Sequence, residues 1–206
     1  MIKHLVIHNS GGLINNPYAS TQHLSVKDID TAHKIRWGVK SSMGWYCGYT
    51  IVIEANGKLT QTRAIGEEGI HAKGHNFDSI GILLMGNFTA GVDQPTFPQE
   101  LALKNLLIRL LNKNFEGLDI LGQKEIFYNN FVADIKDIVP HRALCETTCY
   151  GSGLTDDWAR NLVKGYYKEQ ITLLQSILET LKNIFKTRKQ LGAVVPSSCI
   201  DEDNRG

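Results

Sequence analysis

Short apolar runs punctuated by turn residues characterise the N-terminal part of the chain. Residues 2–7 and 79–88 are almost continuously apolar, which predicts two buried strands. Residues 49–54 and 58–62 are rich in β-branched and aromatic residues, and Ala55-Asn56-Gly57 lies between them as a strong turn signal. This pattern predicts a hairpin. Together these runs supply the strands of one central sheet.

Three other stretches carry apolar residues at helical spacing, namely residues 25–37, 98–114 and 156–190. Ser25 and Asp28 have the spacing of a capping box at the start of the first stretch, and the second stretch has proline in its first turn. Strands mixed with helices in this order predict an α/β domain with a central sheet.

We expect three parts along the chain: a domain over residues 1–155, a long C-terminal amphipathic helix over 156–190, and a flexible tail over 191–206. The tail is rich in Gly, Pro, Ser and acidic residues, a composition typical of loosely attached segments. Residues 115–138 have no clear pattern and receive no assignment.

The composition is that of a soluble globular protein. Of the 206 residues, 42% are hydrophobic and 21% charged, which allows one sizeable core and an appendage. The net charge of +1 predicts no broad attraction to nucleic acid or to an anionic membrane, and no apolar run is long enough to span a membrane. The first residues lack the basic and apolar regions of a secretory signal, so we expect cytoplasmic synthesis.

The stretch VPHRALCETTCYGSGL, residues 139–154, places one histidine and two cysteines close together. A metal site, a disulfide loop and an ordinary polar turn are all compatible with it. Catalytic zinc sites use three protein ligands, often imidazole and thiolate. His141 and Cys149 could supply two, and His8, at the end of the first predicted strand, is the best candidate for the third. Each residue taken alone is a weak signal.

Four blocks in order strengthen the metal-site interpretation: HLVIHNS, GWYCGYTIVIEANGKLTQTR, GIHAKGHNFDSIGILLMGNF and VPHRALCETTCYG. They resemble the zinc-dependent N-acetylmuramoyl-L-alanine amidases, the superfamily that includes the phage lysozyme-type amidases and the peptidoglycan recognition proteins. The resemblance covers residues 1 to about 158. It implies a central mixed β-sheet flanked by helices, to which this chain adds its long C-terminal helix.

The resemblance also implies a set of site residues. His8, His141 and Cys149 bind Zn²⁺, and Cys149 rather than Cys145 has the spacing of the family's last ligand. Cys145 is interpreted as an ordinary thiol, although a disulfide with Cys149 under oxidation stays open. Tyr49 corresponds to the family's catalytic tyrosine.

Five further positions complete the expected site. Thr147 is expected to assist catalysis with its hydroxyl. His71 corresponds to the histidine of the substrate groove, with Trp45 and Asn76 as neighbours for sugar or peptide. Tyr150 replaces the family's usual proline and could line the groove. Two other histidines, His33 and His75, are interpreted as ordinary surface or helix residues.

The implied reaction is hydrolysis of the amide bond between N-acetylmuramic acid and L-alanine in bacterial peptidoglycan by zinc-activated water, as in a phage-type endolysin. The enzyme would reach the wall after release from the cell or as part of a virion. Two alternatives stay open: a peptidoglycan-binding protein without catalysis, and a cytosolic muropeptide-recycling amidase. The presence of Cys149 favours hydrolysis.

The C-terminal helix carries an apolar stripe that needs a partner. The stripe consists of Ile171, Leu174, Leu178, Leu181 and Phe185 at spacings of three and four. Packing on the catalytic domain is the favoured interpretation. Self-association or anchoring is the alternative, because the remaining helix surface is basic and could be attracted to an acidic wall polymer; its basic residues are Lys164, Lys168, Lys182, Lys186, Arg188 and Lys189.

Overall fold

The two apolar runs near the N-terminus and at residue 80 become adjacent parallel strands in the computed structural model, which describes residues 1–122 and 129–192. The elements in chain order are β1 (His4–Asn9), α1 (Val26–Arg36), β2 (Ile51–Ile53), β3 (Leu59–Gln61), β4 (Ser79–Leu84), α2 (Phe97–Leu111), η1 (Ile135–Asp137), β5 (Ile138–Pro140), η2 (His141–Ala143) and α4 (Trp158–Gly192).

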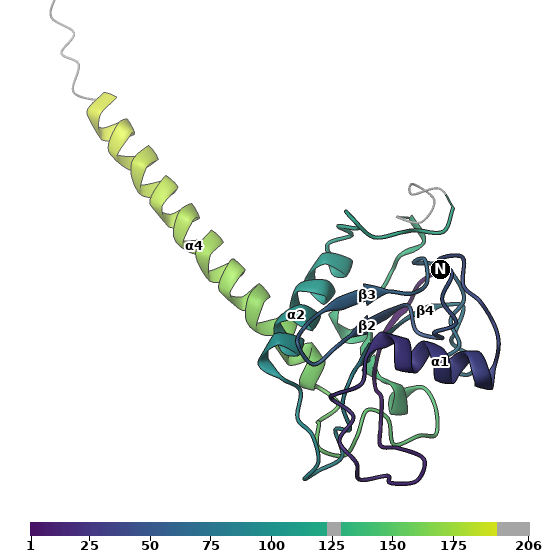
Figure 1. Cartoon of the computed structure of the whole chain (residues 1–206). Helices are drawn as coiled ribbons and strands as arrows, with labels where there is room; N and C mark the ends of the chain where they lie inside the picture. The colour runs from purple at the N-terminus through teal and green to yellow at the C-terminus, as the bar shows by residue number, and fades with distance from the viewer. Residues whose placement is uncertain (123–128, 193–206) are drawn as a thin grey trace, which may run out of the picture. The chain divides into compact units, whose positions relative to one another are not determined.

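The strands form one mixed five-stranded sheet in the order β3-β2-β4-β1-β5. Only β2 and β3 pair in antiparallel fashion, as the hairpin that the turn at Ala55-Asn56-Gly57 predicts; the other neighbours are parallel. Figure 1 shows β2, β3 and β4 side by side, with α1 and α2 nearby. The predicted α/β class with a central mixed sheet is therefore confirmed.

The carboxyl ends of the parallel strands share one edge of the sheet. β1 pairs with β5 in the register that sets Ile7 opposite Pro140, so the next residue of each chain segment, His8 or His141, emerges at that edge. In open α/β sheets this edge is where ligands bind. β5 was not predicted, because three residues ending in proline carry too little pattern to stand out.

Both long strands and one face of α2 form the core. All six residues of β4 are buried, as are five of the six in β1. The buried residues of α2 recur at helical spacing and are Gln99, Leu103, Leu106, Leu107 and Leu110. The buried amide of Gln99 donates to the carbonyl oxygens of Ile53 and Met85, which ties the start of α2 to the ends of β2 and β4.

The chain divides into two compact units, Met1–Lys164 and a second from Gly165 onward. The predicted helix over 156–190 corresponds to α4, which begins at Trp158. Of the predicted tail over 191–206, only the first two residues belong to the described part of the chain. Among the described residues, no helix is both long and apolar enough to cross a membrane.

Candidate functional site

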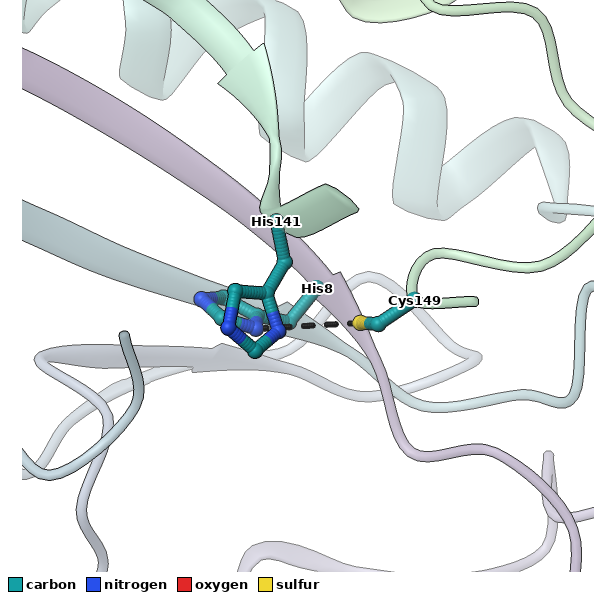
Figure 2. A group of neighbouring side chains, drawn as sticks. All are labelled: His8, His141 and Cys149. Carbon is teal, nitrogen blue, oxygen red and sulfur yellow. Dashed lines mark hydrogen bonds between the residues drawn. The ribbon is translucent and has the colours of Figure 1, made fainter. Parts of the chain in front are cut away.

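Two histidines and one cysteine from distant parts of the chain converge at the carboxyl edge of the sheet. His8 ends β1, His141 directly follows β5, and Cys149 lies in the loop after η2. One nitrogen of each histidine and the sulfur of Cys149 all lie within 4.8 Å of one another. Figure 2 shows the three side chains meeting, with the interaction between His8 and Cys149 dashed.

Cys149 is held in place by backbone contacts on both sides. Its Sγ lies 3.7 Å from Nδ1 of His8 and accepts a hydrogen bond from the Asn9 backbone N–H at 3.5 Å. Its carbonyl oxygen accepts from the Arg142 N–H at 2.9 Å. The loop therefore returns to β1 rather than leaving the sheet edge.

Arg142 fixes the remainder of that loop. Its guanidinium donates to a carboxylate oxygen of Asp156 at 2.7 Å and to the carbonyl oxygens of Gly151 and Leu154 at 2.6 and 2.8 Å. The same group stands over the Tyr150 ring at 5.2 Å. Sequence reasoning missed this role, because the partners of Arg142 are loop carbonyls that carry no residue-type signal.

Tyr150 does not line the groove, contrary to the expectation from the sequence. Only 1% of the residue is exposed, and its hydroxyl donates to the carbonyl oxygen of Thr155 at 2.7 Å. The next residue, Gly151, has a φ of +86° and lies so close to the carbonyl of Phe88 that any Cβ would collide with it. Gly151 thus brings the loop against Phe88, which follows β4, while Tyr150 ties the loop to Thr155.

His71 contacts His8 directly. Its Nδ1 lies 3.0 Å from Nε2 of His8, which leaves Nδ1 of His8 to face Cys149. The His71 ring packs over Gly81, where a Cβ would come within 2.6 Å of it. Asn76 holds the loop in this position, since its Oδ1 accepts from the backbone N–H groups of His71 and Ala72 at 2.8 Å each.

Burial keeps the histidines of the site neutral. Desolvation, followed by the charges of His71 and His141, lowers the pKa of His8 well below its usual value. Desolvation likewise lowers the pKa of His71 to about 3, and it lowers the pKa of His141. Neutral imidazoles have free lone pairs at neutral pH, as metal ligation requires.

The thiol of Cys149 is also held in its neutral form. Desolvation raises its pKa to about 11, against the opposing effects of the Asn9 N–H and the Arg142 charge. A thiol that binds a metal cation is deprotonated by it. Two neutral imidazoles and one thiol that only a nearby cation would ionise form a donor set that fits Zn²⁺.

Tyr49 lies beside the cluster with its ring centroid 4.9 Å from that of His8. Burial, and then the charges of Cys149 and Cys47, raise the pKa of Tyr49 above its usual value. Its hydroxyl therefore stays protonated and can act as a hydrogen-bond donor.

Two cavities of about 720 and 840 Å³ meet at the cluster. Both are lined by Tyr49, His141 and Thr147, so a continuous groove passes the candidate ligands. The hydroxyl oxygen of Thr147 accepts from the Cys149 N–H at 3.3 Å, which leaves its proton free to donate into the groove. His71 and Asn76 line the larger cavity.

The structure places Trp45 outside the groove. It lines neither cavity and packs, like Tyr49, against a buried cluster that contains Val26, Val52 and Leu83. The contacts of Trp45, which was expected to lie near sugar or peptide, are therefore with the core.

Cys145 and His33 both lie against backbone atoms of neighbouring segments. Cys145 and Cys149 are both free thiols, and the Sγ of Cys145 lies 3.6 Å from the carbonyl oxygen of Lys73. The Nδ1 of His33 accepts from the Gly48 N–H at 2.9 Å, and desolvation lowers its pKa to about 4. His33 is therefore a neutral structural residue.

Comparison with known proteins gives consistent results. The profile of the N-acetylmuramoyl-L-alanine amidase family matches residues 1–152. The endolysin of Escherichia phage T7 is 32% identical over 114 residues, which make up 52% of this chain and 68% of that protein.

Solved structures with a similar fold include the N-acetylmuramoyl-L-alanine amidase LysC from Clostridium intestinale, with a TM-score of 0.56 and 22% identity over 79% of this chain and 85% of that one. The Drosophila peptidoglycan recognition protein SD has a TM-score of 0.53 and 21% identity, over 74% of this chain and 76% of that one.

The raised pKa of Cys149 predicts an unusual alkylation profile for the metal-free protein. Iodoacetamide should modify Cys149 slowly at pH about 8 and increasingly fast toward pH about 11, because the thiolate is the reactive form. Mass spectrometry of the peptide that contains Cys149 measures the rate. The same protein unfolded in urea is the control, and an identical pH profile in both states would contradict the burial argument.

Proposed function

Because the chain belongs to the N-acetylmuramoyl-L-alanine amidase family, we propose that His8, His141 and Cys149 hold a Zn²⁺ ion at the centre of its active site. The reaction is hydrolysis of the amide bond that joins N-acetylmuramic acid to the L-alanine of the stem peptide in bacterial peptidoglycan. The convergence of the three ligand atoms within 4.8 Å, at the strand edge and beside an open groove, is the observation that carries the proposal.

When bound, zinc would lower the pKa of a water molecule toward roughly 7 and polarise the substrate carbonyl. The residues of the chain prepare the site for this ion. His8 presents Nδ1 to the cluster because its Nε2 is engaged by His71, and a partner of this kind fixes both the tautomer and the ring orientation of a ligand. Arg142 holds the loop that delivers Cys149.

Tyr49 and Thr147 are the proposed catalytic residues. Both line the groove where His141 lies, and both carry hydroxyl protons that can be donated. During attack on the amide, negative charge develops on the carbonyl oxygen, and fixed donors near that oxygen stabilise it. Tyr49 is the stronger candidate, because its ring packs against His8 and its raised pKa keeps the proton in place.

For the substrate groove we propose His71 and Asn76 as wall residues of the larger cavity. His71 has a second role, since it contacts both the groove and His8. Trp45 acts on substrate only indirectly, through the packing that supports Tyr49. Nucleic acid is not an expected ligand, because the net charge is only +1.

Changing the proposed ligands and the proposed donor should separate metal binding from catalysis. His8→Ala and Cys149→Ser should each lose about one zinc ion per chain and the hydrolytic activity with it. Tyr49→Phe should keep its zinc but lose about 100-fold or more in rate, as removal of one oxyanion donor does. Metal analysis and the clearing of purified sacculi measure the two effects.

His23→Ala is the matched control, because His23 is an exposed histidine outside the site. Full clearing by the metal-free protein would disprove the proposal. Mass spectrometry of products from intact sacculi and from a soluble muropeptide distinguishes wall hydrolysis, expected of a phage-type endolysin, from recycling of soluble fragments. Release of peptide from neither substrate, with zinc bound, would favour binding without catalysis.

The contact between His71 and His8 predicts a second effect on metal affinity. His71→Ala removes the partner of His8 Nε2 and should weaken zinc binding roughly 10- to 100-fold, the usual loss for such a supporting residue. His71→Gln should restore part of the affinity, because its carbonyl oxygen can accept from His8. Competition with a chelator measures both variants, and equal affinity in His71→Ala and the unchanged protein would contradict the role.

We further propose that the protein acts on the wall after release from the cell or as part of a virion.

We also propose that α4 mediates self-association. From Ile171 to Phe185 the apolar side chains of α4 recur at spacings of three and four, so they form one stripe along the helix. A second copy of the same helix would cover such a stripe by coiled-coil packing.

Light scattering on the full-length protein tests self-association. Leu178→Glu places a charge within the stripe and should shift an oligomer toward monomer, whereas Gln175→Glu, at an exposed polar position of the same helix, should leave the mass unchanged. A monomeric mass for the unchanged protein would rule the proposal out.

A further inference from the structure

A second cluster of metal-ligand residues lies at the opposite end of β1. One ligand atom each of His4, His75 and Asp78 lies within 4.8 Å of the other two. His4 begins β1, and the other two residues belong to the segment that leads into β4. The carbonyl oxygen of Asp78 accepts from the backbone N–H groups of Lys3 and His4 at 2.7 and 3.2 Å, so the sheet itself sets Asp78 beside His4.

Three polar atoms of this cluster are buried and have no hydrogen-bond partner. They are Nδ1 of His4, Nδ1 of His75 and Oδ1 of Asp78. Only 4% of Asp78 is exposed, so water cannot easily satisfy its inner oxygen. Buried polar atoms are almost always hydrogen-bonded in folded proteins, and three unpaired ones within one cluster indicate a missing ligand.

A histidine–carboxylate ion pair does not account for all three atoms. Nδ1 of His75 and Oδ1 of Asp78 are 3.4 Å apart, and protonation of His75 would allow an ion pair between them. His4 would still have an unpaired Nδ1, and its ring meets that of His75 edge to face at 83°. A cation that accepts one lone pair from each residue satisfies all three atoms at once.

We propose that His4, His75 and Asp78 bind a second divalent transition-metal ion, separate from the catalytic centre. Two imidazole nitrogens and one carboxylate oxygen are a donor set that zinc and its first-row neighbours accept. Ligand atoms around zinc lie roughly 3.3–3.5 Å apart, so atoms that lie within 4.8 Å of one another need to close by at most about 1.5 Å. The ammonium of Lys3 binds the outer oxygen of Asp78 at 3.2 Å and leaves Oδ1 as the single carboxylate ligand.

This site is too far from the catalytic cluster to share its ion. His4 precedes His8 by four residues along one strand, which corresponds to about 13 Å. Its role is structural, because it cross-links the start of β1 to the segment of residues 71–79. That segment carries His71 at its other end, and Ser79 donates to the carbonyl of His75 while its Oγ lies 3.4 Å from Nε2 of His71. The second ion therefore steadies the loop that orients His8.

Zinc stoichiometry of the full-length protein, made without a histidine tag, tests the proposal. Equilibrium dialysis should find about two zinc ions per chain in the unchanged protein and about one in His75→Ala, in Asp78→Asn and in Cys149→Ser. His75→Ala changes a partly exposed side chain, and Asp78→Asn preserves shape, so neither is expected to unfold the domain. His23→Ala, the control, should keep both ions.

Cobalt(II) distinguishes the two sites by spectroscopy. Only the ion bound by Cys149 should give a thiolate-to-metal charge-transfer band, whereas the ion at the second site should give ligand-field absorption without it. In the Cys149→Ser background, zinc should still raise the thermal midpoint, and the added His75→Ala change should abolish that rise.

The outcomes separate this site from the catalytic one. A single zinc ion that depends on Cys149 and not on His75 or Asp78 would overturn the second site and leave the proposed function intact. A single ion that depends on His75 and not on Cys149 would support the second site and contradict the catalytic one.

Discussion

The parallel pairing of β1 with β5 is the constraint on which the active site depends. With Ile7 opposite Pro140, His8 and His141 leave the sheet side by side at the carboxyl edge. A shift of one residue would turn His8 to the other face of the sheet. The strand register therefore fixes the position of a candidate metal ligand.

The candidate ligands beside this strand pair are neutral groups whose lone pairs are available to a cation. Burial holds His8 and His141 neutral and raises the pKa of Cys149, so the cluster has lone pairs but no formal charge of its own at neutral pH. Arg142 has two effects at once: it fixes the loop through three hydrogen bonds, and its positive charge partly counters the desolvation of the thiol. A loop residue outside the ligand set therefore controls both the position and the ionisation of the sulfur.

One strand and one neighbouring segment connect the two clusters. His4 and His8 are separated by an even number of residues and so lie on the same face of β1, at its two ends. Opposite them, residues 71–79 place His71 against His8 and His75 against His4. Packing of this segment over Gly81 is close enough that a side chain there would displace His71. The same local geometry therefore places a candidate metal ligand at each end of the strand.

The sequence by itself determined the elements and the chemistry of the main site. Continuous apolar runs, the Asn56-Gly57 turn and helical spacing predicted β1, β4, the hairpin and three helices, because these signals are local. The four ordered blocks indicated His8, His141, Cys149 and Tyr49, and the structure brings these residues together. The contacts of Trp45 with the core and the role of Arg142 were not predicted, since side-chain direction depends on the packing around it. The cluster of His4, His75 and Asp78 could be found only in the tertiary structure, because strand register joins His4 to residues that lie 71 and 74 positions further along the chain, and no local pattern encodes that register.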